Sequence, residues 1–144
     1  MRRLALACVA TIAVADYVIK RRDPPWLVVG LLDEPAHLAT AILCNPTPGR
    51  AYLAGSLLPD LDHVPLAFGS PRPGDPRPKT HSLYAILPAA LVSRDLAAGM
   101  LAHFARDLAL DPGLPLLGGR HFRVPYGTYA LLVLASAYSR SRPC

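Results

Sequence analysis

The sequence lacks any uninterrupted run of about 20 apolar residues, the length that an ideal membrane-spanning helix needs. It also lacks a Cys-x-x-Cys pair, and its three cysteines, Cys8, Cys44 and Cys144, lie far apart. Neither a disulfide framework nor a cysteine-based zinc site is therefore expected. Charged residues make up only 17% of the 144 residues. The basic residues stand in short groups beside apolar segments, so nucleic acid is not an expected partner.

Apolar residues are in excess, at 52% of the chain, and there are 16 prolines. Because a soluble domain of this size buries roughly 70% of its surface, the apolar surplus predicts contact with membrane lipid. The prolines cluster between apolar segments, where they interrupt helices. No strand-like alternation and no internal repeat is found. We therefore predict an all-α, small multi-helix bundle with proline-broken helices, which is membrane-associated and crosses the cell (inner) membrane several times.

Two regions are expected along the chain. Residues 1–22 contain an apolar run, broken by Thr11 and Asp16, between two basic groups. This pattern predicts an N-terminal membrane anchor, although Ala13-Val14-Ala15 also suits the cleavage site of a signal-like segment. Residues 23–144 are predicted to form a helical domain with further membrane segments. The polar residues described next make this domain a candidate for metal binding, and the oligomeric state stays open.

The expected helices begin or end at prolines and capping residues. Pro35 suits the first turn of a helix that continues to about Cys44. Thr80 or Ser82 suits the cap of a helix that ends at Val92. Further helices are expected over 50–58, 96–110 and 126–138.

His103 and Asp107 form the most specific single motif. Residues four apart lie on one face of a helix, so both side chains can point at one ion. Imidazole and carboxylate together suit zinc or a similar cation. The alternatives are an ordinary hydrogen bond between the two residues, or pairing of Asp107 with Arg106 or Arg94.

The other potential ligands also lie within or at the ends of apolar segments. Asp60, Asp62 and His63 follow Pro59, although the two aspartates can equally be turn or cap residues. His37 can share a helical face with Asp33 or Glu34. Capping explains Thr80 and Ser82 but leaves His81 unexplained. His81 stands at a predicted helix start, so its ring projects toward any site on that side of the membrane. His63 and His121 are weaker candidates. Because an unpaired ionisable group in an apolar environment is costly, we infer one joint metal site.

The order and spacing of these motifs resemble the YdjM-like family of inner-membrane metal-dependent hydrolases. The resemblance covers most of the chain between residues 37 and 126. It is carried by four segments, Ala36-His37-Leu38-Ala39-Thr40, Gly55-Ser56-Leu57-Leu58-Pro59-Asp60-Leu61-Asp62-His63, Arg77-Pro78-Lys79-Thr80-His81-Ser82 and Leu101-Ala102-His103-Phe104-Ala105-Arg106-Asp107. The family in turn is similar to zinc-dependent phospholipase C and nuclease P1-type enzymes. This chain departs from the family at Pro76-Arg77-Pro78, where only the arginine of a His-Arg-Gly motif is kept.

The resemblance implies an all-helical hydrolase that cleaves a phosphoester or lipid-like substrate with a metal-activated water. The implied metal ligands are His37, Asp60, Asp62, His81, His103 and Asp107, and they would hold one or two ions. Zinc is expected first, with manganese or magnesium as alternatives. Asp60 or Asp62 would orient or deprotonate the water, and Arg77 or Arg120 would hold an anionic group of a small-molecule or lipid-like substrate. The competing hypotheses are a non-catalytic membrane protein that binds or transports a metal, and a helical membrane scaffold.

Overall fold

The computed structural model describes residues 2–63, 81–110, 113–115 and 121–141, with the side chain of Asp62 left out of the description. Most of these residues are helical, which confirms the all-α prediction. The elements are α1 (Arg2–Arg22), α2 (Trp26–Cys44), α3 (Arg50–Leu57), η1 (Leu58–His63), η3 (Leu83–Ala85), α5 (Ile86–Val92), α6 (Arg94–Asp107), β1 (Leu114–Pro115), β2 (His121–Phe122) and α7 (Tyr126–Ser141). The antiparallel pair β1 and β2 was not predicted; it joins Leu114 to Phe122 and Pro115 to His121.

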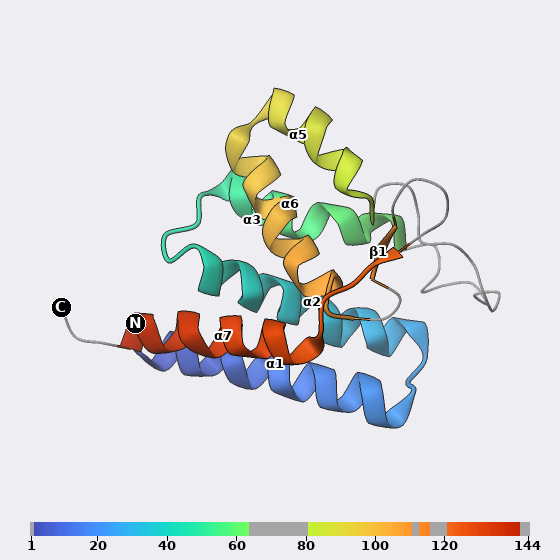
Figure 1. Cartoon of the computed structure of the whole chain (residues 1–144), viewed down its shortest axis with the longest axis vertical. Helices are drawn as coiled ribbons and strands as arrows, with labels where there is room; N and C mark the ends of the chain where they lie inside the picture. Colours follow the sequence, from blue (N-terminus) through green and yellow to red (C-terminus); the bar gives the residue numbers. More distant parts are fainter. Residues whose placement is uncertain (1, 64–80, 111–112, 116–120, 142–144) are drawn as a thin grey trace.

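Helix α2 lies at the centre of the bundle. On one side it contacts α1 and α7, which lie side by side, and on the other it contacts α3 and α6 (Figure 1). The α3 and α6 helices pack closely together, and α5 packs against α6. Residues on α2 can therefore face both the α1–α7 layer and the α3–α6 layer.

Three apolar clusters pack the described helices together, and the smallest, Ala41, Tyr52 and Ala102, joins α2 to α3 and α6. The first lies between α1, α2 and α7, and its buried residues are Ala5, Cys8, Ile12, Ala15, Ala36, Ala39, Leu43, Ala109, Tyr129 and Val133. The second lies between α5 and α6 around Met100 and Phe104 and includes Leu114 of β1. Many of these core residues are alanines, which let the helices approach closely. The α1 helix thus packs as part of the bundle through its small residues.

Serine side chains cap two of the helices, one at the predicted place and one earlier than predicted. The Ser82 side chain accepts a hydrogen bond from the Tyr84 amide and caps η3, as predicted. The α6 helix begins at Arg94, two residues earlier than expected, because the Ser93 side chain accepts a hydrogen bond from the Leu96 amide.

The prediction that Pro35 opens a helix is wrong. The α2 helix begins at Trp26, and Pro35 lies in its interior. A proline there removes one backbone hydrogen bond, a change that costs about 3 kcal/mol in an isolated helix. The helix continues because Leu32 and Ala36, on either side of Pro35, both pack into the core between α1, α2 and α7.

Within the described ranges, α2 alone is long and apolar enough to cross a membrane by length and composition. This finding does not support the expected multi-pass topology. Exposed large apolar side chains are nevertheless numerous on the helices; on α2 they are Trp26, Leu27, Val28 and Leu31. The apolar surplus of the composition is thus carried partly by the protein surface.

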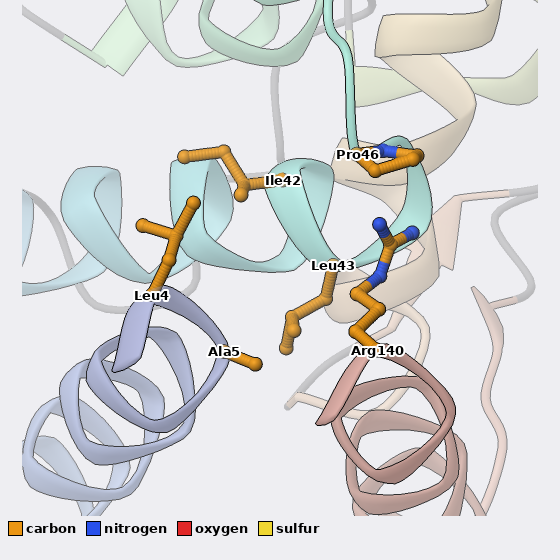
Figure 2. Close-up of a pocket in the computed structure, with 6 residues that line it drawn as sticks. All are labelled: Leu4, Ala5, Ile42, Leu43, Pro46 and Arg140. Atoms are coloured by element: carbon orange, nitrogen blue, oxygen red, sulfur yellow. The ribbon is translucent and has the colours of Figure 1, made fainter. Parts of the chain in front are cut away.

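A small cavity of about 20 Å³ lies where the start of α1, the end of α2 and the end of α7 meet (Figure 2). Leu4, Ala5, Ile42, Leu43, Pro46 and Arg140 line it. It has room for about one water molecule, and none of the predicted ligands lines it. The candidate site therefore lies elsewhere in the bundle.

Candidate metal centre

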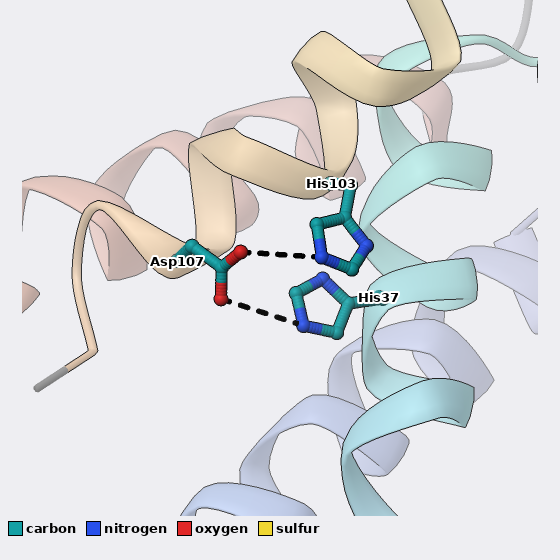
Figure 3. A group of neighbouring side chains, drawn as sticks. All are labelled: His37, His103 and Asp107. Atoms are coloured by element: carbon teal, nitrogen blue, oxygen red, sulfur yellow. Dashed lines mark ion pairs between the residues drawn. The ribbon is translucent and has the colours of Figure 1, made fainter. Parts of the chain in front are cut away.

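The α2 and α6 helices bring His37, His103 and Asp107 together (Figure 3). His103 and Asp107 lie one turn apart on α6, and His103 Nε2 is 3.2 Å from Asp107 Oδ2. His37 Nε2 on α2 is 3.7 Å from Asp107 Oδ1. The imidazole rings of His37 and His103 stack with their centroids 3.7 Å apart. Both histidines are fully buried and Asp107 is 4% exposed, so this group is shielded from water.

A second group consists of Asp60 and His63 on η1 with His81, which directly precedes the Ser82 cap of η3. Asp60 Oδ1 is 3.0 Å from His81 Nε2 and 3.3 Å from His63 Nδ1. Asp60 is 13% and His63 24% exposed, whereas His81 is 1% exposed. This group therefore contains the more accessible edge of the histidine and aspartate cluster.

Asp60 joins the two groups. Its Oδ1 is 3.5 Å from His103 Nε2, and its Oδ2 is 3.8 Å from His37 Nε2. His81 Nε2 is also 3.9 Å from Asp107 Oδ2. We call the six residues His37, Asp60, His63, His81, His103 and Asp107 the His/Asp cluster. Because both Asp60 oxygens face histidines of the first group, the cluster is one continuous site.

The separations fit shared coordination better than direct hydrogen bonding. Hydrogen bonds between nitrogen and oxygen are about 2.7–3.2 Å long, but most contacts to His37 and His103 Nε2 are longer, between 3.5 and 3.8 Å. Two ligand atoms about 2.0–2.1 Å from one tetrahedral ion lie roughly 3.4 Å apart. Among the described residues, His37 Nδ1 and Nε2 and His103 Nε2 have no hydrogen-bond partner despite being buried. The cluster can therefore hold a metal ion.

A backbone carbonyl fixes the protonation of His103. Its Nδ1 is 2.9 Å from the Ser56 carbonyl oxygen, so Nδ1 carries the proton and donates to that oxygen. Nε2 faces Asp107 and Asp60, and it can offer a lone pair to an ion once it has lost its own proton. This arrangement, in which the second ring nitrogen donates to the backbone, is common for histidine ligands of metals.

Two glycines permit the approach of α3 to α6 that places Ser56 beside His103. A Cβ at Gly99 would lie 2.0 Å from the Tyr52 carbonyl oxygen and 2.9 Å from the Ser56 amide nitrogen. A Cβ at Gly55 would lie 2.1 Å from the Leu96 carbonyl oxygen. Any side chain at either position would push the helices apart. The contact between Ser56 and His103 thus depends on glycine on both helices.

The charges of the cluster stabilise one another in the metal-free protein. Burial acts to raise the pKa of Asp60, but hydrogen bonds from His63 and His81 and the nearby His37 and His103 outweigh it and lower that pKa. For His103, burial acts to lower the pKa, yet the Asp107 and Asp60 carboxylates raise it. Asp60 is therefore a carboxylate at neutral pH, and a cation can replace the positive charge that protonated histidines provide.

The structure brings together five of the residues predicted as ligands, which are His37, Asp60, His81, His103 and Asp107. His63, which the sequence ranked lower, belongs to the same cluster. His121 is exposed on β2 and belongs to neither group. The Asp62 side chain, Arg77 and Arg120 lie outside the described part of the chain, so their predicted roles stay predictions.

Three residues beside the cluster were missed or only partly anticipated. Arg106 was weighed as a partner for Asp107, but its guanidinium pairs with Asp16 and Asp33. Asp33 was placed on the face of His37, and its Oδ2 is 3.5 Å from His37 Nε2. The available signal for Asp16 was its position as an acid within an apolar helix, a placement that usually implies a charged partner.

Comparisons with protein-family models, with curated proteins and with solved structures found no match to this chain.

Proposed function

We propose that the protein is a membrane-bound, metal-dependent hydrolase whose His/Asp cluster holds one or two divalent ions. The observation that carries the proposal is the convergence of four histidines and two aspartates from α2, η1, α6 and the segment before η3. Orphaned imidazole nitrogens in a buried carboxylate environment are the donor set that zinc prefers, with manganese or magnesium as alternatives. The motif resemblance described above supports the same class.

The arrangement of the carboxylates supports two adjacent ions. His37, His103 and Asp107 form one candidate ligand set, and Asp60, His63 and His81 form the other. Asp60 Oδ1 approaches His63, His81 and His103, while Oδ2 approaches His37. A carboxylate with its oxygens between two ligand sets suits a bridge between two ions. One ion in the buried set is the simpler alternative.

A divalent ion held here would lower the pKa of a bound water and polarise the bond to be cleaved. Asp60 is the carboxylate best placed to orient that water, because it lies at the partly exposed edge of the cluster and is ionised at neutral pH. His103 keeps its Nε2 directed inward through its hydrogen bond to the Ser56 carbonyl. The burial of His37 and His81 keeps bulk water from their ring nitrogens.

The proposed substrate is a phosphoester with a lipid-like part. Exposed apolar side chains border the accessible edge of the cluster: Leu58 and Leu61 lie on η1 with Asp60, and the Trp26 ring centroid is 6.2 Å from that of His63. Tryptophan and leucine beside a basic group, here Lys20, Arg21 and Arg22, suit a membrane surface. Attachment through this surface and the exposed apolar residues at the start of α2 is the membrane association we propose.

A structural metal site is the second candidate, and the deep burial of His37, His103 and Asp107 favours it. A structural ion has all its positions filled by protein atoms, whereas a catalytic ion keeps one open position for water. An open position would lie at the edge of the cluster where Asp60 and His63 are partly exposed.

Hydrolysis by the purified full-length protein tests the proposal. The protein is loaded with Zn²⁺, Mn²⁺ or Mg²⁺ in detergent and given synthetic phosphomonoesters, phosphodiesters and short-chain phospholipids. We expect turnover that needs the metal and is lost in Asp60→Asn but kept in Asp95→Asn, which replaces an exposed aspartate of α6. Stoichiometric metal without turnover on any of these substrates would favour the structural site instead.

A further inference from the structure

Arg106 is a fully buried cation next to the cluster in sequence, yet it is directed away from Asp107 toward α1 and α2. Its Nη2 donates to Asp16 Oδ1 at 2.7 Å and to Asp33 Oδ1 at 2.6 Å, and its Nε donates to Asp33 Oδ1 at 3.0 Å. The Tyr126 hydroxyl of α7 donates to Asp16 Oδ2. Arg106 is thus held by partners from two other helices, α1 and α2, and Tyr126 of α7 supports one of these partners, Asp16.

The two oxygens of Asp33 face different groups. Oδ1 accepts both hydrogen bonds from Arg106, while Oδ2 lies 3.5 Å from His37 Nε2. The same His37 nitrogen is 3.7 Å from Asp107 Oδ1 and 3.8 Å from Asp60 Oδ2. Because Arg106 fixes one oxygen of Asp33, the other is fixed at the edge of the cluster.

We propose that Arg106, supported by Asp16 and Tyr126, is a positioning residue that holds the Asp33 carboxylate against the metal centre. The inference rests on the proposed metal binding and adds the residues that hold the Asp33 carboxylate beside the metal ligands. A carboxylate that contacts a metal ligand from behind, as Asp33 contacts His37, orients that ligand and increases the affinity for the ion. It also makes α1 part of the working site, since Asp16 reaches Arg106 only from the folded α1 helix.

Stability alone does not explain this network well. Buried ion pairs can often be replaced by apolar residues of similar volume without loss of stability, because the charges lose their hydration on burial. Arg106 is moreover pointed at two acids, so the group of three carries a net negative charge beside His37. An excess of negative charge at this position favours a bound cation.

The test uses the full-length protein and Co²⁺, whose visible absorption reports the geometry of its ligands. Three changes are compared: Asp16→Asn, the double change Asp16→Leu with Arg106→Met, and Tyr126→Phe. Asp95→Asn is the matched control, because Asp95 is an exposed aspartate of α6 outside the network. Melting is followed by circular dichroism so that folding and metal binding are read separately.

We expect the double variant to bind Co²⁺ about 10- to 100-fold more weakly, with a shifted spectrum, and to melt below the wild-type temperature because Asp33 loses the cation that it pairs with. Tyr126→Phe, which removes one hydroxyl and keeps all charges, should fold and show a smaller change in the same direction. If Asp16→Asn does not fold, these two variants still decide the matter. Wild-type affinity and spectrum in both would overturn the positioning role, whereas a wild type that binds no Co²⁺ would overturn the proposed metal site itself.

Discussion

Replacing Gly99 with alanine should weaken both the fold and the metal site. The new Cβ would lie 2.0 Å from the Tyr52 carbonyl oxygen, whereas ordinary contacts begin at 3.4 Å. The two helices must therefore separate by about 1.4 Å at this point, because the obstacle is backbone and not a flexible side chain. The separation acts directly on Ser56, whose carbonyl oxygen accepts the hydrogen bond from His103 Nδ1.

The size of the effect follows from two opposing contributions. Overpacking of a dense helix interface costs about 1–3 kcal/mol, and the severity of this overlap places it near the upper end. Alanine in place of glycine within a helix returns about 1 kcal/mol. The net loss of about 2 kcal/mol corresponds to a fall in Tm of roughly 4–8 °C for a chain of this size. A shift of more than about 0.5 Å also exceeds what a preorganised metal site tolerates.

The assay compares thermal melting and Zn²⁺ affinity of Gly99→Ala with those of Gly30→Ala. Gly30 also lies in a helix, but a Cβ there would meet nothing within 4 Å. Gly30→Ala should therefore keep wild-type affinity and melt at or slightly above the wild-type temperature. If Gly99→Ala retains both the wild-type Tm and the wild-type affinity, the close contact of α3 and α6 does not position His103.

Three further predictions concern pH and capping. Metal affinity should increase as the pH rises through the raised pKa of His103, because the proton on Nε2 competes with the ion. The Kd for Zn²⁺ is measured by competition with a chelator, and a Kd that stays unchanged between about pH 5.5 and 8 would contradict this prediction. In the metal-free protein, the lowered pKa of Asp60 stabilises the fold above the ordinary carboxyl pKa, and this stabilisation is lost as the pH falls. The raised pKa of His103 stabilises the fold below the ordinary imidazole pKa, and this stabilisation is lost as the pH rises. The Tm of the metal-free protein should therefore be highest between about pH 4 and 6.5, and a Tm that rises steadily to pH 8 would refute the assignment. Ser93→Ala removes the side chain that caps α6 and should lower the free energy of unfolding by about 1 kcal/mol in urea titrations, while Ser139→Ala, an exposed serine of α7, should change it little.

Local patterns predicted those parts of the site that lie within one helix. The spacing of His103 and Asp107 places both on one face of α6, and the structure brings them within 3.2 Å. The placement of His37 one turn after Asp33 also follows from helical geometry alone. Such relations need only the 3.6-residue period, so a single sequence contains them.

Relations between distant segments were not predictable in the same way. Arg106 and Asp16 are 90 residues apart, and nothing in the sequence near Arg106 distinguishes Asp16 from the neighbouring Asp107 as its partner. Pro35 was expected to open a helix because proline usually breaks one, but the packing of Leu32 and Ala36 against other helices decides otherwise. The approach of α3 to α6 likewise depends on two glycines, Gly55 and Gly99, on different helices.

The central claim is that the His/Asp cluster binds metal, and elemental analysis tests it most directly. Wild-type protein purified in detergent, before and after reconstitution with Zn²⁺, is compared with His37→Ala and His103→Ala, which remove buried ligands, and with His121→Ala, which removes an exposed histidine outside the cluster. The account predicts one or two equivalents of metal in the wild type and in His121→Ala, and loss of metal in folded His37→Ala and His103→Ala. A folded wild type that stays free of metal after reconstitution would contradict it.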